Sequence, residues 1–177
     1  MKITDLYSLL SADASRRNIS NVTIFVLKST IRSGDSAVIL YRLQCYLATK
    51  SNILAKCFSR LNLVLNGIEF VLGSEIGPGL VISHPVGIVV GNKVKAGANL
   101  LLMQGVSLGQ LGFDNSREVL TGNPQIGDNV SVGASAIILG KVSIGDNCIV
   151  GAGAVVLKNV PSGFKAIGNP AELSRIK

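Results

Sequence analysis

The sequence predicts a mainly β protein, a parallel β-helix preceded by an α-helical region. Three observations support this class. A six-residue period runs unbroken from Ile126 to Val160, and an aliphatic residue opens each of its blocks. A less regular form of the same period runs from Phe70 to Leu108, and residues 1–67 lack it. A period of six fits neither an α-helix nor a lone strand, but it is typical of a coil built from three short strands and three corners.

Residues 1–67 are expected to form a helical region. Thr4 is placed as the N-cap of a first helix, because apolar residues then recur at helical spacing. The apolar run Val22–Ile31 is short and β-branched, so its spacing leaves helix and strand open. Ser36–Leu65 shows a helical pattern again, and Gly67 is the expected stop. These helices are expected to cover the end of the prism. The alternative is a basic amphipathic surface that contacts a membrane.

Residues 68–165 are predicted to form the coils of the β-helix. In the regular part the opening aliphatic side chains are expected to point inward, and small or β-branched residues follow four places later. The frame moves by two between Ile88 and Val90, which indicates a small bulge at a corner. The six-residue period stops over residues 109–125, which are polar, charged and rich in residues that break regular structure. We interpret them as a loop that leaves one corner, and loops of this length are more often functional than idle. Residues 166–177 are expected to be a C-terminal tail.

Composition restricts the partners. The formal net charge is +7, which suits either a solvated surface or an anionic ligand, since lysines are spread through the predicted coils at 93, 95, 141, 158 and 165. There is no nucleic-acid-binding module, so a phosphorylated small molecule is the better candidate partner.

The chain is expected to be cytoplasmic. Its first residues are too acidic for a signal peptide, and no apolar run reaches the roughly 18 residues of a membrane span. Cys45, Cys57 and Cys148 show no motif spacing, so we expect reduced thiols.

His84 is the only histidine, and it falls near a predicted corner. Glu69 lies fifteen residues earlier, close to the length of one coil, so the fold could bring the two side chains together. A carboxylate beside an imidazole is a general-base arrangement, in which the acid fixes the ring and the ring accepts a proton. A buried structural pair is the alternative.

Several segments together resemble a known family. These are GIEFVLGSEIGPGLVISHPVGIVVG, MQGVSLG, PQIGDNVSVGASAIILGKVSIGD, VGAGAVVLKNVP and AIGNPA, together with KITDLYSLLSADAS at the start. In this order they are similar to the hexapeptide-repeat acetyltransferases, and within them to the serine O-acetyltransferases.

The resemblance implies a left-handed β-helix that forms a homotrimer, with acetyl-CoA in the groove between adjacent subunits. It implies that His84 is the catalytic base and that Glu69 orients it. It also implies coenzyme contacts for Gly109, Ala134 and Ala152, and Lys158 is a further candidate for coenzyme binding. Asp13 matches a substrate-facing aspartate. No metal is implied.

Two departures concern the acceptor. The family has Asp where this chain has Ser83, and Arg-His-Pro where it has Gly122, Asn123 and Pro124. An amino-acid carboxylate favours a bidentate cationic partner, which Arg117 in the longer loop is a candidate to supply. Asp13, Ser83, Asn123 and Arg117 are therefore the candidate acceptor-binding residues.

These residues lead to an acetyl-CoA-dependent O-acetyltransferase. Because the amino-acid clamp is altered, we expect the acceptor to be a sugar hydroxyl of a surface polysaccharide or its precursor. L-serine, as in cysteine biosynthesis, is the alternative acceptor. A non-catalytic β-helix scaffold is the alternative from a different class.

Overall fold

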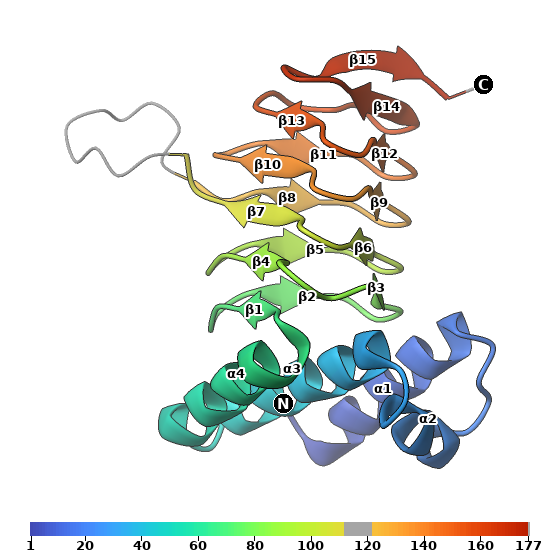
Figure 1. The fold of residues 1–177 in the computed structure, drawn as a ribbon, viewed down its shortest axis with the longest axis vertical. Helices are drawn as coiled ribbons and strands as arrows, with labels where there is room; N and C mark the ends of the chain where they lie inside the picture. The colour runs from blue at the N-terminus through green and yellow to red at the C-terminus, as the bar shows by residue number, and fades with distance from the viewer. Residues whose placement is uncertain (112–121, 177) are drawn as a thin grey trace.

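The computed structural model describes residues 1–111 and 122–176. Four helices lie at one end, and a three-sided β-helix rises from them to the C-terminus (Figure 1). The predicted class, a left-handed parallel β-helix with an N-terminal helical region, is confirmed. No helix of the described part is long and apolar enough to cross a membrane.

The helices are α1 (Ile3–Arg16), α2 (Val22–Ser29), α3 (Ser33–Ala48) and α4 (Asn52–Asn66). The run that was left open is thus the helix α2, whose N-cap Asn21 accepts hydrogen bonds from two backbone amides. Thr4 as N-cap is wrong, because α1 begins one residue before it, after Lys2. The long pattern contains two helices with a break at 49–51. Gly67 ends α4 with a φ of 66°, as expected.

Three sheets form the faces of the prism. Sheet A holds β1 (Glu69–Phe70), β4 (Val89–Val90), β7 (Ser107–Gly109), β10 (Ile137–Leu139) and β13 (Val155–Val156). Sheet B holds β2 (Glu75–Ile76), β5 (Lys95–Ala96), β8 (Gln125–Ile126) and β11 (Ser143–Ile144). Sheet C holds β3 (Val81–Ser83), β6 (Leu101–Met103), β9 (Ser131–Val132), β12 (Ile149–Val150), β14 (Phe164–Ile167) and β15 (Glu172–Arg175).

The hexad residues fill the core, as predicted. The block-opening aliphatics are buried, and so are the residues four places later, namely Val130, Ala136, Val142, Cys148, Ala154 and Val160. Each coil stacks on the next through parallel pairing. Burial of this aliphatic column is the main stabilising contribution of the prism.

One coil is longer than the regular repeat. Phe70 pairs with Val90, twenty residues on, whereas Val90 pairs with Leu108, eighteen residues on. The two extra residues lie in the corner between β3 and β4. The predicted bulge is therefore confirmed, and it falls on the corner that carries His84.

The helices cap the first coil, as expected, because no coil lies beneath it to satisfy its backbone groups. Side chains of α3 supply the partners. Gln44 donates to the Phe70 carbonyl, and the Tyr41 hydroxyl accepts from the Ile76 amide. The Tyr41 ring stacks on Phe70 with centroids 4.2 Å apart. Burial raises the pKa of the Tyr41 phenol, so this hydroxyl stays neutral.

The opposite end closes differently. The expected boundary at residue 165 falls inside β14, and the expected tail contains β15, which pairs antiparallel with β14. This reversal covers the last coil. The three cysteines are free thiols, and burial raises the pKa of the Cys45 thiol.

Candidate active site

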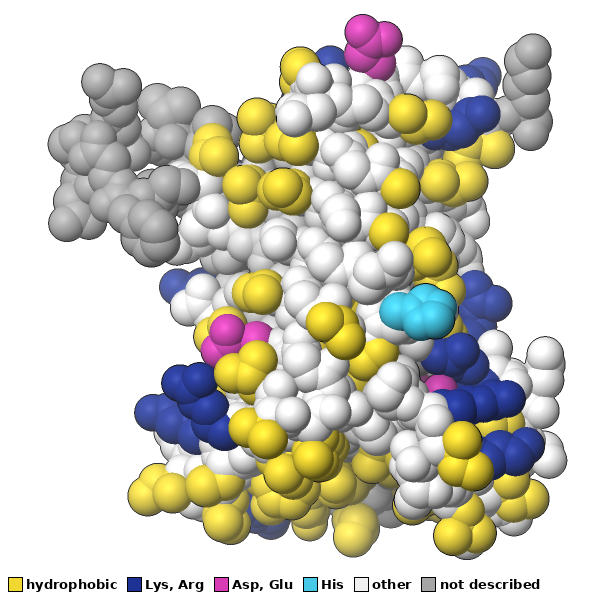
Figure 2. Space-filling model, viewed as in Figure 1, with side chains coloured by type: hydrophobic (Ala, Val, Ile, Leu, Met, Phe, Trp, Pro, Cys, Tyr) yellow, Lys and Arg dark blue, Asp and Glu magenta, His cyan; other side chains and the backbone are white. Residues whose placement is uncertain are grey.

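His84 stands at the corner between sheets C and A. Its φ of 56° lies in the left-handed region, as does that of other non-glycine corner residues such as Lys93 and Asn129, so this backbone conformation belongs to the corners of the β-helix. Pro85 beside it is buried, whereas His84 itself is exposed and is the cyan side chain in Figure 2. The longer corner thus presents the single imidazole to solvent on a rigid support.

Corners from successive coils stack above His84 and form what we call the histidine edge, comprising residues 84–88, 104–106, 133–136 and 151–154. Backbone hydrogen bonds run up this edge, from Gly105 to Val86 at 3.0 Å and from Gly153 to Ala134 at 2.8 Å. Two of the expected coenzyme contacts, Ala134 and Ala152, therefore share an edge with His84.

Glu69 begins β1, next to the same edge. Its amide donates to the Ile88 carbonyl at 2.9 Å, so the backbones of the two predicted catalytic residues lie in neighbouring coils. Within the described residues no hydrogen bond or ion pair joins the Glu69 carboxylate to the His84 imidazole. The structure brings the pair to one edge without closing a contact between the side chains.

The remaining expected coenzyme residues lie on another edge. Gly109 ends β7 and Lys158 follows β13, both where sheet A turns into sheet B. We call this the loop edge, comprising residues 91–94, 110–111, 122–124, 140–142 and 157–159. Asn123 is buried on it, and a cavity of about 590 Å³ there is lined by Asn123, Lys93 and Lys141 among others. Arg117 lies outside the described residues.

A smaller cavity of about 250 Å³ adjoins His84. Ser83, Arg17 and Arg32 line it with His84, together with the first turn of α3. Arg17 donates to the Ile82 carbonyl at 2.5 Å, and its Nε lies 3.1 Å from Oδ1 of Asp35. Arg17 and Asp35 therefore form an ion pair without a hydrogen bond.

Within the part of the chain that the structure describes, the cavity carries positive charge. The one carboxylate next to it, that of Asp35, is buried beneath Arg17. Sequence reasoning missed both arginines. Arg32 precedes α3, which packs on β3, and Arg17 follows α1 and reaches the Ile82 carbonyl of β3. No motif in the sequence marks either residue.

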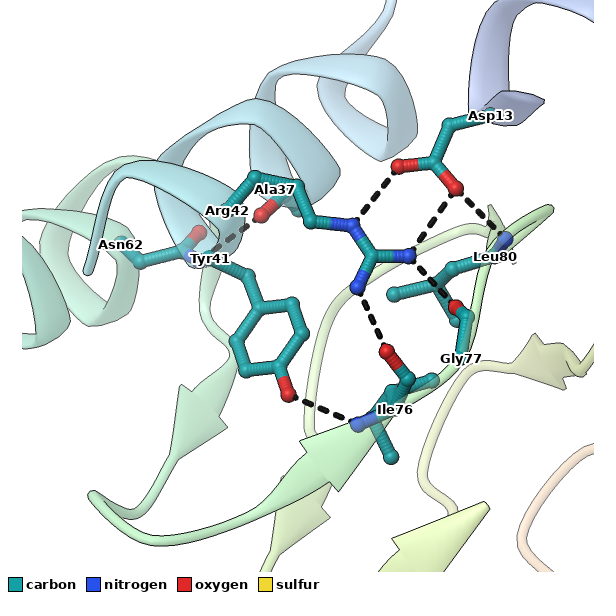
Figure 3. A network of polar contacts seen from close by, with 8 residues as sticks. All are labelled: Asp13, Ala37, Tyr41, Arg42, Asn62, Ile76, Gly77 and Leu80. Carbon is teal, nitrogen blue, oxygen red and sulfur yellow. Dashed lines mark hydrogen bonds and ion pairs between the residues drawn. The ribbon is translucent and has the colours of Figure 1, made fainter. Parts of the chain in front are cut away.

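Asp13, a candidate acceptor-binding residue, lies in the interior of the helical end. It is fully buried, and its carboxylate accepts two hydrogen bonds from Arg42 and one from the Leu80 amide (Figure 3). Arg42 in turn donates to the carbonyls of Ile76 and Gly77. In this conformation the pair ties α1 and α3 to the first coil.

Comparisons with known proteins agree with this architecture. Residues 123–158 match the family model "Bacterial transferase hexapeptide (six repeats)". The chain is 33% identical to a serine acetyltransferase of Staphylococcus xylosus over 123 residues, which are 70% of this chain and 52% of that protein. The aligned part thus spans about half the length of that relative.

Solved structures extend the match. The soybean serine acetyltransferase apoenzyme superposes with a TM-score of 0.83 at 31% identity, covering 96% of this chain and 69% of the soybean chain. The soybean protein has also been solved with serine. A serine acetyltransferase in complex with CoA matches at 26% identity with a TM-score of 0.80, covering 97% and 70% of the two chains.

The fold and the repeat define a hexapeptide-repeat transferase of the left-handed β-helix type. Within that class, the chain belongs to the serine acetyltransferase family.

Proposed function

We propose that this protein is an acetyl-CoA-dependent O-acetyltransferase whose acceptor is L-serine. The observation that carries the proposal is the position of His84. In a chain of the serine acetyltransferase family, the only histidine stands exposed on the lengthened corner, beside a small cationic cavity. The scaffold alternative gives no reason for that arrangement.

The chemistry needs one base. With the acceptor hydroxyl against His84, the imidazole removes the proton as the oxygen attacks the thioester carbonyl of acetyl-CoA. The new C–O bond forms, the C–S bond breaks, and the proton passes from the imidazolium to the departing thiolate. Glu69, at the same edge, is the proposed partner that orients the ring. Backbone amides near Gly109 of an adjacent copy are candidates to stabilise the oxyanion.

Serine replaces the sugar acceptor that the altered loop suggested. The relatives reported above are serine acetyltransferases, and the soybean protein has been solved with serine.

The helical region can supply the cationic partner for the serine carboxylate. Arg32 is exposed and lines the cavity beside His84, and a guanidinium binds a carboxylate bidentately. Arg32 therefore takes the role that the family gives to the loop arginine, and Asp13, held by Arg42, has a structural role.

Acetyl-CoA is proposed to lie along the histidine edge, against Ala134 and Ala152. Lys158 belongs to the loop edge, on the other side of sheet A, together with Lys93 and Lys141. We propose that an adjacent copy in a homotrimer presents its loop edge to this histidine edge, so that these lysines reach the coenzyme phosphates.

The test is free-thiol release from acetyl-CoA by the purified protein, with L-serine and a panel of sugars and nucleotide sugars offered separately. We expect turnover with L-serine, its loss in His84→Ala, and a KM for serine about ten- to a hundredfold higher in Arg32→Gln. Arg175→Gln, on the far end of the molecule, is the matched control and keeps the wild-type KM. Turnover with a sugar alone would overturn the acceptor, and equal turnover in His84→Ala would overturn the catalytic base.

A further inference from the structure

Helix α4 exposes its apolar side and buries its polar side. Asn62 is fully buried, as is Ala55, and Asn66 is nearly so. On the outside, Ile53 is 76% and Val64 is 80% exposed. We define the outer face of α4 by its exposed large apolar residues, Ile53, Leu54, Leu61, Val64 and Leu65. A surface helix of a globular protein has the opposite arrangement, so the outer face requires its own explanation.

Hydrogen bonds hold α4 in this orientation. The Asn62 amide donates to the Ala37 carbonyl of α3 at 3.0 Å, and the Asn66 amide donates to Oδ1 of Asn62 at 2.9 Å. Ser36 of α3 donates to Oδ1 of Asn66 at 2.6 Å. Rolling the helix to bury its apolar side would break this buried chain of bonds, which is costly in the interior. The apolar side is therefore directed outward by the fold.

The surroundings of this face are basic. Lys56 and Arg60 are exposed on α4, and Lys50 is exposed just before it. Between residues 14 and 68 the only acidic residue is Asp35, which is 1% exposed. The helical end thus presents apolar side chains and positive charge with no exposed acid over that range.

The same end carries more apolar surface on α2, where Leu27 is exposed, and just after it at Ile31, with Lys28 between them. Figure 2 shows hydrophobic side chains gathered along this end, with Lys and Arg among them. A large exposed apolar patch marks an interaction site, and the outer face of α4 is such a patch.

We propose that the outer face of α4 rests on an anionic membrane surface. Apolar side chains at the centre and cations around them match the acyl boundary and the acidic headgroups of such a bilayer. A second copy docked on the same face would bring Lys56 and Arg60 of both copies together without an acid to offset them. Charge complementarity therefore favours the lipid surface, with the β-helix directed away from it (Figure 1).

The test is co-sedimentation of the full chain with vesicles of phosphatidylcholine alone and of phosphatidylcholine with phosphatidylglycerol. We expect binding to the anionic vesicles and a partition coefficient about thirtyfold lower in Lys56→Gln/Arg60→Gln, since each cation near such a surface contributes on the order of 1 kcal/mol. The matched control Lys165→Gln/Arg175→Gln removes the same charge from β14 and β15 and retains binding.

The apolar part has its own variant. Ile53→Ser/Val64→Ser is expected to lose vesicle binding while keeping its thermal midpoint, because both side chains are exposed. Ile167→Ser, exposed at the opposite end, serves as the control and binds like wild type. Equal partition into neutral and anionic vesicles, or no partition at all, would overturn the proposal. So would a drop in the mass measured by light scattering in Ile53→Ser/Val64→Ser, since a second copy would then occupy the face.

Discussion

Arg42 is a buried cation, and each nitrogen of its guanidinium donates a hydrogen bond. Its Nε and Nη2 bind the Asp13 carboxylate at 2.8 and 3.0 Å, and Nη1 donates to the Ile76 carbonyl at 2.6 Å. Burial lowers the pKa of the guanidinium, but the hydrogen bonds and charge of Asp13 raise it by more, so it lies above its ordinary value. Arg42 is therefore charged in the folded protein, and the Asp13 carboxylate compensates its charge.

Removing one member leaves the other uncompensated. We expect Arg42→Met to lower the free energy of unfolding by about 3–5 kcal/mol, because the Asp13 carboxylate stays buried with only the Leu80 amide as partner. The measurement is the urea midpoint, with exposed Arg60→Met as a control that changes stability by less than about 0.5 kcal/mol. The double variant Asp13→Leu/Arg42→Met should recover part of the loss. A loss below about 1 kcal/mol in the single variant would contradict the assigned role.

The sequence indicated that His84 is a candidate site residue, but it did not indicate the ion pair that Asp13 makes. A single histidine next to a frame shift in a periodic pattern is visible by inspection. The contact between Asp13 and Arg42 joins residues 29 positions apart on two helices, and it depends on how α1 and α3 cross. No local pattern in the sequence indicates how the two helices cross, so the ion pair of Asp13 could not be predicted from it.

At the scale of elements, the start of α3 sets the shape of the cavity beside His84. Gly34 in its first turn lies against β3, where an added Cβ would collide with the Ile82 carbonyl oxygen and come within 3.3 Å of Nη2 of Arg17. The same carbonyl accepts the hydrogen bond from Arg17. A glycine is needed here for a close approach of helix to strand.

Two opposing effects on stability act in Gly34→Ala, so the sign of the change in the free energy of unfolding tests the close contact. Helix propensity alone would make alanine more stable by up to about 1 kcal/mol, whereas the collision should make it less stable by about 1–3 kcal/mol. We expect destabilisation and a fall in thiol release, measured by urea unfolding and by turnover on the same preparation. Asn52→Ala, at the exposed start of α4, is the control and should be neutral or slightly stabilising. A more stable Gly34→Ala would show that α3 can withdraw from β3 without cost.

The strands of the β-helix could be predicted from the sequence more fully than the helices. Each hexad residue packs in a coil that repeats the one before it, so the period alone places Ile126 to Val160 in the core. The helices have no such repetition. The break at 49–51 lies between two apolar patterns that continue one another, and the outward apolar side of α4 is set by the buried Asn62 and Asn66, whose partners on α3 lie 25 and 30 residues away.

At the scale of the whole molecule, the candidate catalytic and coenzyme-binding residues fall on two edges of one prism. His84, Ala134 and Ala152 lie where sheet C turns into sheet A, and Gly109 and Lys158 lie where sheet A turns into sheet B. The strands of sheet A, two or three residues long, separate the two edges. A rigid β-helix cannot fold one edge onto the other, so a site that uses both needs two copies.

Mixing inactive variants tests this arrangement directly. His84→Ala removes the base from the histidine edge, and Lys158→Glu repels the coenzyme phosphates from the loop edge, so each homogeneous protein should release little thiol. Refolding or co-expressing the two in equal amounts would place an intact histidine edge against an intact loop edge in about a quarter of the sites of a cyclic assembly. We therefore expect thiol release to recover to about a quarter of the wild-type rate, whereas a mixture whose activity is no greater than that of its components would mean that each chain holds a whole site.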